Sequence, residues 1–209
     1  MDALAVYVDL KSPYAYLALG PTRELCRSHG VAIDWLPYVL DIPSYLGSAR
    51  LDPATGVVVE SERNEHQWRR VRYAYMDVRR EANRVGLTIR GTQKIWDTRL
   101  AAIALLYAKR SAPERIDAFL EATFAPFWRR ELDAESASVL AAKLDESGID
   151  ARGFAAFAAG EGREQLAREM QAAHARGVFG VPSYGWRGEL FWGREHLPRL
   201  AEKMRARRS

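Results

Sequence analysis

The sequence predicts an α/β protein in which a β-α-β unit near the start of the chain and a β-β-α unit near its end share one sheet. Two observations lead to this prediction: strand-like runs lie towards the two ends, and about a hundred residues between them keep a helical period. With 209 residues, 48% of them hydrophobic, the chain can bury a large core. We expect one domain in two halves, residues 1–45 and 176–209, and a helical insertion over residues 46–175.

The first unit begins with an apolar run over residues 4–8, which predicts a strand, and continues with a helical pattern. Pro13 suits the first position of that helix and Ser12 suits its N-cap. Gly30 ends the pattern, and residues 31–38 predict a second strand, parallel to the first through a right-handed crossover. Ser12 has two interpretations. Either it only caps the helix, or its hydroxyl and the positive helix end also hold a thiolate or carboxylate.

The central block is predicted to be helical after a loop. Residues 41–56 are rich in Pro, Gly, Ser and Asp, which indicates a loop. A helix then runs from about Asn64 to Gly86 with an apolar stripe of Trp68, Val71, Tyr75, Val78, Ala82 and Val85.

Five further helices are expected before the chain returns to strands. Asp97 suits an N-cap, and residues 111–114 form a capping box before the stripe of Ile116, Phe119, Leu120, Phe124 and Phe127. Helices through residues 139–144 and 154–157 follow, with interruptions at Gly160 and Gly162. The last of this group ends at Gly177.

The final unit is predicted to be a hairpin followed by a helix. Residues 179–186 and 189–192 are short apolar runs on either side of Arg187-Gly188, as in an antiparallel hairpin. A helix from about Arg194 closes the chain.

Composition narrows the classes of partner and site. The net charge of +4 comes from arginines in scattered pairs rather than one block, and no nucleic-acid-binding motif occurs, so we expect no nucleic-acid partner. Cys26 is the single cysteine, which excludes an intrachain disulfide and favours a buried apolar role. The four histidines lack metal-ligand spacing. No signal peptide or membrane span is apparent, so we expect a cytoplasmic protein with no metal and no membrane partner.

A β-α-β unit and a β-β-α unit with Pro182 before the third strand is a thioredoxin-like arrangement. With an all-helical insertion between the halves, the predicted fold is a thioredoxin-like fold with a DsbA-type insertion. DsbA-type proteins carry Cys-x-x-Cys at the start of the first helix. Here Ser12 and Ala15 occupy the two sulfur positions, which excludes dithiol–disulfide exchange by this loop.

Three strings carry a closer resemblance. Ser-Pro-Tyr-Ala-Tyr-Leu at 12–17, Gly-Val-Phe-Gly-Val-Pro-Ser at 177–183 and Leu-Phe-Trp-Gly-Arg-Glu at 190–195 are similar to the 2-hydroxychromene-2-carboxylate isomerase family. That family includes the kappa-class glutathione transferases. The resemblance covers both thioredoxin halves well and the insertion loosely.

The resemblance implies glutathione as cofactor, with the Ser12 hydroxyl bonded to its sulfur. It also implies a cis Pro182, with the backbone of Val181 pairing with the extended ligand, and a γ-glutamyl site at Arg194 and Glu195. From the residues alone, Pro182 could instead be trans at a strand start, and Glu195 could stabilise its own helix. The chain departs from the family in the loop at 46–53, which lacks an Asn and a Pro pair, and at Asp97, whose charge would repel a carboxylate.

The implied activity is a glutathione-dependent cis–trans isomerisation of an aromatic-pathway carboxylate such as 2-hydroxychromene-2-carboxylate. Two alternatives stay open: a kappa-type transferase or peroxidase, and a non-catalytic thioredoxin-fold module that binds extended peptides. The expected partners are glutathione, a small-molecule substrate and a second copy of the chain in a homodimer. An aromatic wall could come from Tyr14, Tyr45, Trp68 and Trp96, and a carboxylate could bind Lys94, Arg72 or Arg99.

Overall fold

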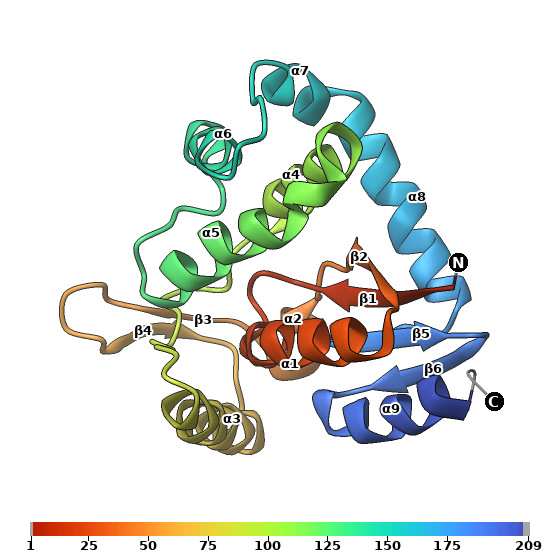
Figure 1. The fold of residues 1–209 in the computed structure, drawn as a ribbon. Helices are drawn as coiled ribbons and strands as arrows, with labels where there is room; N and C mark the ends of the chain where they lie inside the picture. Colours follow the sequence, from red (N-terminus) through yellow and green to blue (C-terminus); the bar gives the residue numbers. More distant parts are fainter. Residues whose placement is uncertain (1, 207–209) are drawn as a thin grey trace.

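The computed structural model describes residues 2–206, and its centre is a four-stranded sheet in the order β2-β1-β5-β6 (Figure 1). The strands are β1 (Ala3–Val8), β2 (Ala32–Pro37), β5 (Ser183–Trp186) and β6 (Glu189–Trp192). β1 pairs in parallel with β2 and antiparallel with β5. Val6 lies opposite Trp35 on one side and Tyr184 on the other, and all three are buried. The predicted sharing of one sheet by the two chain ends is confirmed.

Local sequence signals explain the elements of the two end units. Ser12 caps α1 (Pro13–His29), and Gly30 ends it in the left-handed region at φ 62°. The β5–β6 turn has positive φ at both Arg187 and Gly188, which matches the right-handed twist of a two-residue hairpin. A short 3-10 turn η2 (Arg194–His196) leads into α9 (Leu197–Ala206), which packs against α1.

Six longer helices come from the middle of the chain. They are α3 (Glu65–Arg84), α4 (Arg99–Ser111), α5 (Ile116–Trp128), α6 (Ala137–Glu146), α7 (Phe154–Ala159) and α8 (Glu161–Ala175). α4 and α8 pack on each other and against β2, while α5, α6 and α7 gather around α4 (Figure 1). The domain limits at residues 45–46 and 175–176 stay a prediction. No helix within residues 2–206 is long and apolar enough to cross a membrane.

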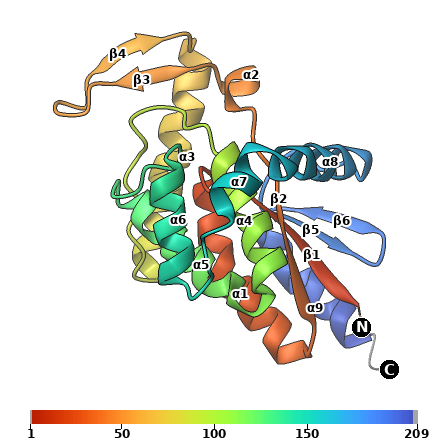
Figure 2. The same ribbon diagram turned by 90° about the horizontal axis from the view of Figure 1, so that it is seen from above.

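The loop predicted over residues 41–56 is wrong. This stretch holds a short helix α2 (Ile42–Leu46) and a strand β3 (Ala49–Leu51), which pairs antiparallel with β4 (Val58–Ser61). Pro43 sits in the first turn of α2, where its missing N–H costs nothing. The β3–β4 hairpin projects away from the main sheet in both views (Figures 1 and 2), while α3 packs against α1.

Two predicted helix starts are also wrong. Ser111 belongs to the end of α4, and a 3-10 turn η1 (Pro113–Arg115) precedes α5 without a side-chain cap, so no capping box forms. The N-cap of α4 is Thr98 rather than Asp97. Its hydroxyl does not cap the helix because it donates to the carboxylate of Asp9.

Two residues in the predicted helices behave differently from expectation. Val85 is 63% exposed, so it does not continue the buried stripe of α3. Gly162 lies inside α8 and does not interrupt it. A Cβ at this position would come within 2.6 Å of the Ile103 side chain, so the glycine allows α8 to pack closely on α4. The expected stripe of α5 is buried throughout.

Candidate active site

Ser12 lies at the junction of β1 and α1 and does more than cap the helix. Its hydroxyl accepts a hydrogen bond from the backbone N–H of Ala15 at 3.2 Å and donates one to the carbonyl of Val181 at 3.4 Å. The Val181–Pro182 bond is cis, as predicted. The fold therefore brings the start of α1 against the loop before β5, although the two segments are 169 residues apart in the sequence.

A cavity of about 540 Å³ opens beside Ser12. Its wall comes from the start of α1, from α2 and α3, from residues 92–96, from residues 179–181 and from Trp192. Of the residues predicted to line it, Tyr14, Tyr45, Trp96 and Lys94 do so. Trp68, Arg72 and Arg99 are not among the lining residues. Trp68 donates to the Ser61 hydroxyl instead, and Arg99 pairs with Asp97.

Beneath Ser12 lies a buried polar cluster that the sequence analysis missed. The carboxylate of Asp9 accepts hydrogen bonds from the backbone of Leu40 at 2.7 Å and from the Thr98 hydroxyl at 2.6 Å. The ammonium of Lys11 lies 3.6 Å from the same carboxylate and donates to the Trp96 carbonyl. Burial raises the pKa of Asp9, and Lys11 and the hydrogen bonds oppose that rise. The cluster ties the β1–α1 loop to the segments that follow β2 and precede α4.

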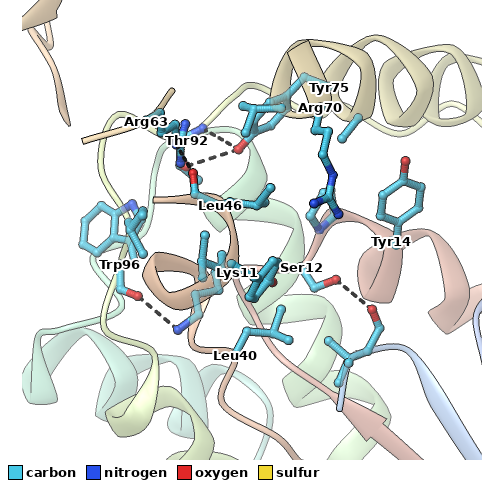
Figure 3. A pocket seen from close by; sticks show the side chains of 18 of the residues that line it. Lys11, Ser12, Tyr14, Leu40, Leu46, Arg63, Arg70, Tyr75, Thr92 and Trp96 are labelled. Carbon is cyan, nitrogen blue, oxygen red and sulfur yellow. Dashed lines mark hydrogen bonds between the residues drawn. The ribbon is translucent and has the colours of Figure 1, made fainter. Parts of the chain in front are cut away.

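Residues from α3 and the segment after it complete the opposite wall of the cavity. Tyr75 and Thr92 line it and hydrogen bond through their hydroxyls at 3.3 Å (Figure 3). Arg63 and Arg70 line it too. Sequence reasoning missed all four and chose Arg72 instead. Arg70 lies about 40° around the helix from Ala74, which lines the cavity, whereas Arg72 lies about 160° from it, so Arg70 shares the cavity-facing side of α3 and Arg72 does not.

The predicted γ-glutamyl site lies beside the Pro182 loop. The Gly193 backbone N–H donates to the Pro182 carbonyl at 2.9 Å, which places η2 next to that loop. Arg194 donates to Glu81 on α3 at 2.6 Å, and Glu195 is exposed. Neither side chain is among those lining the cavity. Their roles stay predictions.

The charge of Asp97, expected to repel a carboxylate, is neutralised locally. Arg99 hydrogen bonds to its carboxylate through the side chain and the backbone. These contacts hold the pKa of Asp97 below its usual range. Asp97 is therefore ionised but paired.

The family is decided by a match along nearly the whole chain. A model of the DSBA-like thioredoxin domain matches residues 3–205. This chain belongs to the DsbA-like thioredoxin domain family. Members of this fold among solved structures include a 2-hydroxychromene-2-carboxylate isomerase, with a TM-score of 0.73 and 22% identity over 98% of this chain and 95% of that one. The cytosolic disulfide reductase DsbM from Pseudomonas aeruginosa, solved with GSH, has a TM-score of 0.61 and 16% identity over 98% and 96%.

The curated relatives that this chain resembles share one name. The chain is 28% identical to a 2-hydroxychromene-2-carboxylate isomerase from Sphingobium xenophagum, over 91% of this chain and 92% of that protein. It is 25% identical to one from Pseudomonas putida, over 95% and 92%. The predicted fold class and the resemblance to this isomerase family are confirmed.

The cysteine chemistry separates this DsbA-like protein from the disulfide reductases that share its fold. Cys26, the single cysteine, is buried in α1. Burial, assisted by the charge of Asp117, raises the pKa of its thiol to about 12. The chain therefore presents a hydroxyl, and no thiol pair, at the cavity.

Proposed function

We propose that this protein is a glutathione-dependent cis–trans isomerase of an aromatic-pathway carboxylate such as 2-hydroxychromene-2-carboxylate. The observation that carries the proposal is the position of the Ser12 hydroxyl, at the start of α1, against Val181 and on the wall of the cavity. The relatives named 2-hydroxychromene-2-carboxylate isomerase support an isomerase.

The residues beside Ser12 fit a peptide-like thiol. Within residues 2–206 the backbone N–H of Val181 has no hydrogen-bond partner, although Val181 lines the cavity. A tripeptide such as glutathione offers a carbonyl to such a group. We assign its binding to Val181 and Pro182, with Arg194 and Glu195 at the γ-glutamyl end. The solved DsbM structure with GSH supports thiol binding by this fold.

Glutathione, when bound, would supply a thiolate nucleophile that the chain itself lacks. The chain would contribute the environment that favours the thiolate over the thiol. The Ser12 O–H would turn from the Val181 carbonyl to donate to a sulfur anion, and the first-turn N–H groups of α1 place a partial positive charge there. The apolar and aromatic residues of the cavity, including Tyr45 and Trp96, would enclose a flat substrate and exclude water.

The proposal is tested by following the isomerisation of 2-hydroxychromene-2-carboxylate in ultraviolet light with and without glutathione. We expect turnover only with glutathione, and none with S-methylglutathione, which lacks a free thiol but should compete for the site. Full turnover without any thiol would contradict the proposal. Calorimetry with millimolar glutathione that detects no binding would favour the non-catalytic module.

We further propose a homodimer in the cytoplasm, the compartment where glutathione keeps thiols reduced. Val57, Val58 and Val59, at the start of and within β4, are 44–62% exposed, an apolar surface suited to a second copy. Light scattering of the wild type and of Val58→Lys would test this. A monomeric wild type would contradict it.

A further inference from the structure

The cationic residues on the cavity wall differ in whether the protein neutralises them. None of the residues that line the cavity is acidic. Three of its cations have partners within the protein: Lys11 has Asp9, Lys94 has Glu135 at 2.6 Å, and Arg63 has the carbonyls of Leu46 and Gly47 at 3.1 Å. Arg70 forms no ion pair and no hydrogen bond with any residue in the described range 2–206.

The position of Arg70 directs this free charge into the cavity. Val71 and Ala74, on the same face of α3, line the cavity with it. Figure 3 shows the Arg70 side chain descending from α3 towards Ser12 and Tyr14. Arg70 is exposed, so a ligand entering the cavity can reach its guanidinium.

An unpaired guanidinium above a largely apolar cavity selects a planar anion. Its fork of N–H donors matches the two oxygens of a carboxylate, whereas a neutral amide satisfies it only in part. We propose that Arg70 is a specificity-determining residue that binds the carboxylate of the small-molecule substrate. The inference rests on the proposed function, since it assigns the substrate of that same site.

The carboxylate that binds Arg70 is assigned to the substrate rather than to glutathione because the residues that suit each ligand lie on different walls of the cavity. Ser12 and the unpaired N–H of Val181 lie on one wall and suit the thiol and backbone of a peptide. Arg70 comes from α3 on the other wall (Figure 3). A substrate placed between the two would have its conjugated carbons near Ser12 and its carboxylate at Arg70.

The test compares binding of trans-2-hydroxycinnamate with that of its amide, two probes that differ mainly in charge. Wild type should prefer the acid roughly tenfold to a hundredfold, and Arg70→Met should abolish the preference. Arg70→Lys keeps the charge but not the fork, so it should retain part of the preference. In turnover, Arg70→Met should raise KM for the acid with little change in kcat, because the contact is made before and during the reaction.

Arg72→Met is the matched control. Arg72 lies on the same helix, is exposed and has no ion pair or hydrogen bond in the described chain, but it does not line the cavity. It should leave the acid preference unchanged. An equal loss of the acid preference in both variants would show a general effect of positive charge and would overturn the proposal. An unchanged preference in Arg70→Met would also overturn it.

Further measurements distinguish substrate binding by Arg70 from glutathione binding and from a structural role. Glutathione affinity should be the same in wild type and Arg70→Met, and a selective loss of that affinity would assign Arg70 to glutathione and overturn the inference. Since Arg70 has no partner in the described fold, its removal should not lower the thermal midpoint. If wild type shows no thiol-dependent turnover, the proposed function fails, while the acid preference and its loss in Arg70→Met remain measurable.

Discussion

The two walls of the cavity are built in different ways. The inner wall, formed by Lys11, Ser12 and Val181 above the buried carboxylate of Asp9, consists of buried residues linked by hydrogen bonds to one another or to neighbouring segments. The outer wall, formed by α2 and α3, has few buried side chains, and its polar residues reach solvent. We infer that the two walls have different roles. The hydrogen-bonded inner wall holds the Ser12 hydroxyl in place, and the proposed selection of the ligand falls to the more accessible outer wall.

The largest effect should follow from removing the buried carboxylate that lies beneath the inner wall. Asp9→Ala removes the partner of Lys11 and leaves the Leu40 N–H without its acceptor. Loss of one member of a buried ion pair costs about 3–5 kcal/mol, so we expect the free energy of unfolding to fall by that amount. Urea denaturation measures it.

An exposed ion pair provides the control for Asp9. Asp150 pairs with Arg152 on the surface, so Asp150→Ala should change stability little. The double variant Asp9→Leu/Lys11→Met should regain part of the lost stability. If Asp9→Ala is as stable as wild type, the inner wall does not depend on this cluster.

The second effect concerns activity at Ser12. Ser12→Ala removes the one hydroxyl proposed to stabilise the thiolate, and loss of such a donor lowers turnover about 100-fold. It also removes a helix cap worth about 1 kcal/mol. Initial rates with saturating glutathione measure the first effect and denaturation the second.

Ser136→Ala separates these two effects. Ser136 caps α6 by accepting from the Val139 N–H and does not line the cavity. The Ser136→Ala variant should lose a similar amount of unfolding free energy to Ser12→Ala but should keep its activity. Equal activity in both variants would show that Ser12 is only a cap.

The third effect compares two thiols in one molecule. Ser12→Cys places a thiol at the start of α1, where the helix end lowers its pKa. Cys26 should not be alkylated, because its pKa is raised to about 12 and only the thiolate reacts. Iodoacetamide at pH 7.5 should therefore label one site, about tenfold faster than free cysteine.

The pH dependence sharpens this comparison. Raising the pH to 9 should add little labelling in the wild type, since the Cys26 thiol remains protonated well above that value. An introduced thiol that reacts no faster than free cysteine would count against the site. Mass spectrometry identifies the labelled residue.

The smallest effect should come from the contact between the walls. Tyr14 donates to Asp77 on α3 at 3.1 Å, and burial and Asp77 raise the pKa of its phenol to about 12, so it remains a donor at neutral pH. Tyr14→Phe removes one hydrogen bond, worth about 0.5–1 kcal/mol at this partly exposed place. Amide exchange in α3 should accelerate by a few-fold.

Tyr73→Phe is the control for the contact between the walls. Tyr73 also lies on α3, is 59% exposed and has no hydrogen bond within the described residues. Its variant should exchange like the wild type. Identical exchange in Tyr14→Phe would mean that packing alone holds α3 in place.

The sequence was most informative where the signal is local. The cap at Ser12, the stop at Gly30 and the turn at Arg187-Gly188 depend on residues within a few positions of each other, and each was predicted and found. The sequence was misleading where the structure of a residue depends on a partner outside its own segment. The Pro, Gly, Ser and Asp content of residues 41–56 predicted a loop, and only the pairing of β3 with β4 shows that residues 49–51 form a strand. Thr98 occupies the N-cap position, but its hydroxyl bonds to Asp9, 89 residues away, which no local signal reveals.

The amino-acid sequence by itself determined the order of elements in the two end units, the absence of a thiol pair and the hydroxyl at the start of α1. Only the tertiary structure decided that Asp9 and Lys11 form a buried cluster and that Arg70, not Arg72, faces the cavity. The physical reason is that charge and polarity in the sequence do not reveal what a side chain will face. A buried ion pair and a free guanidinium are defined by neighbours that only the packed chain brings together.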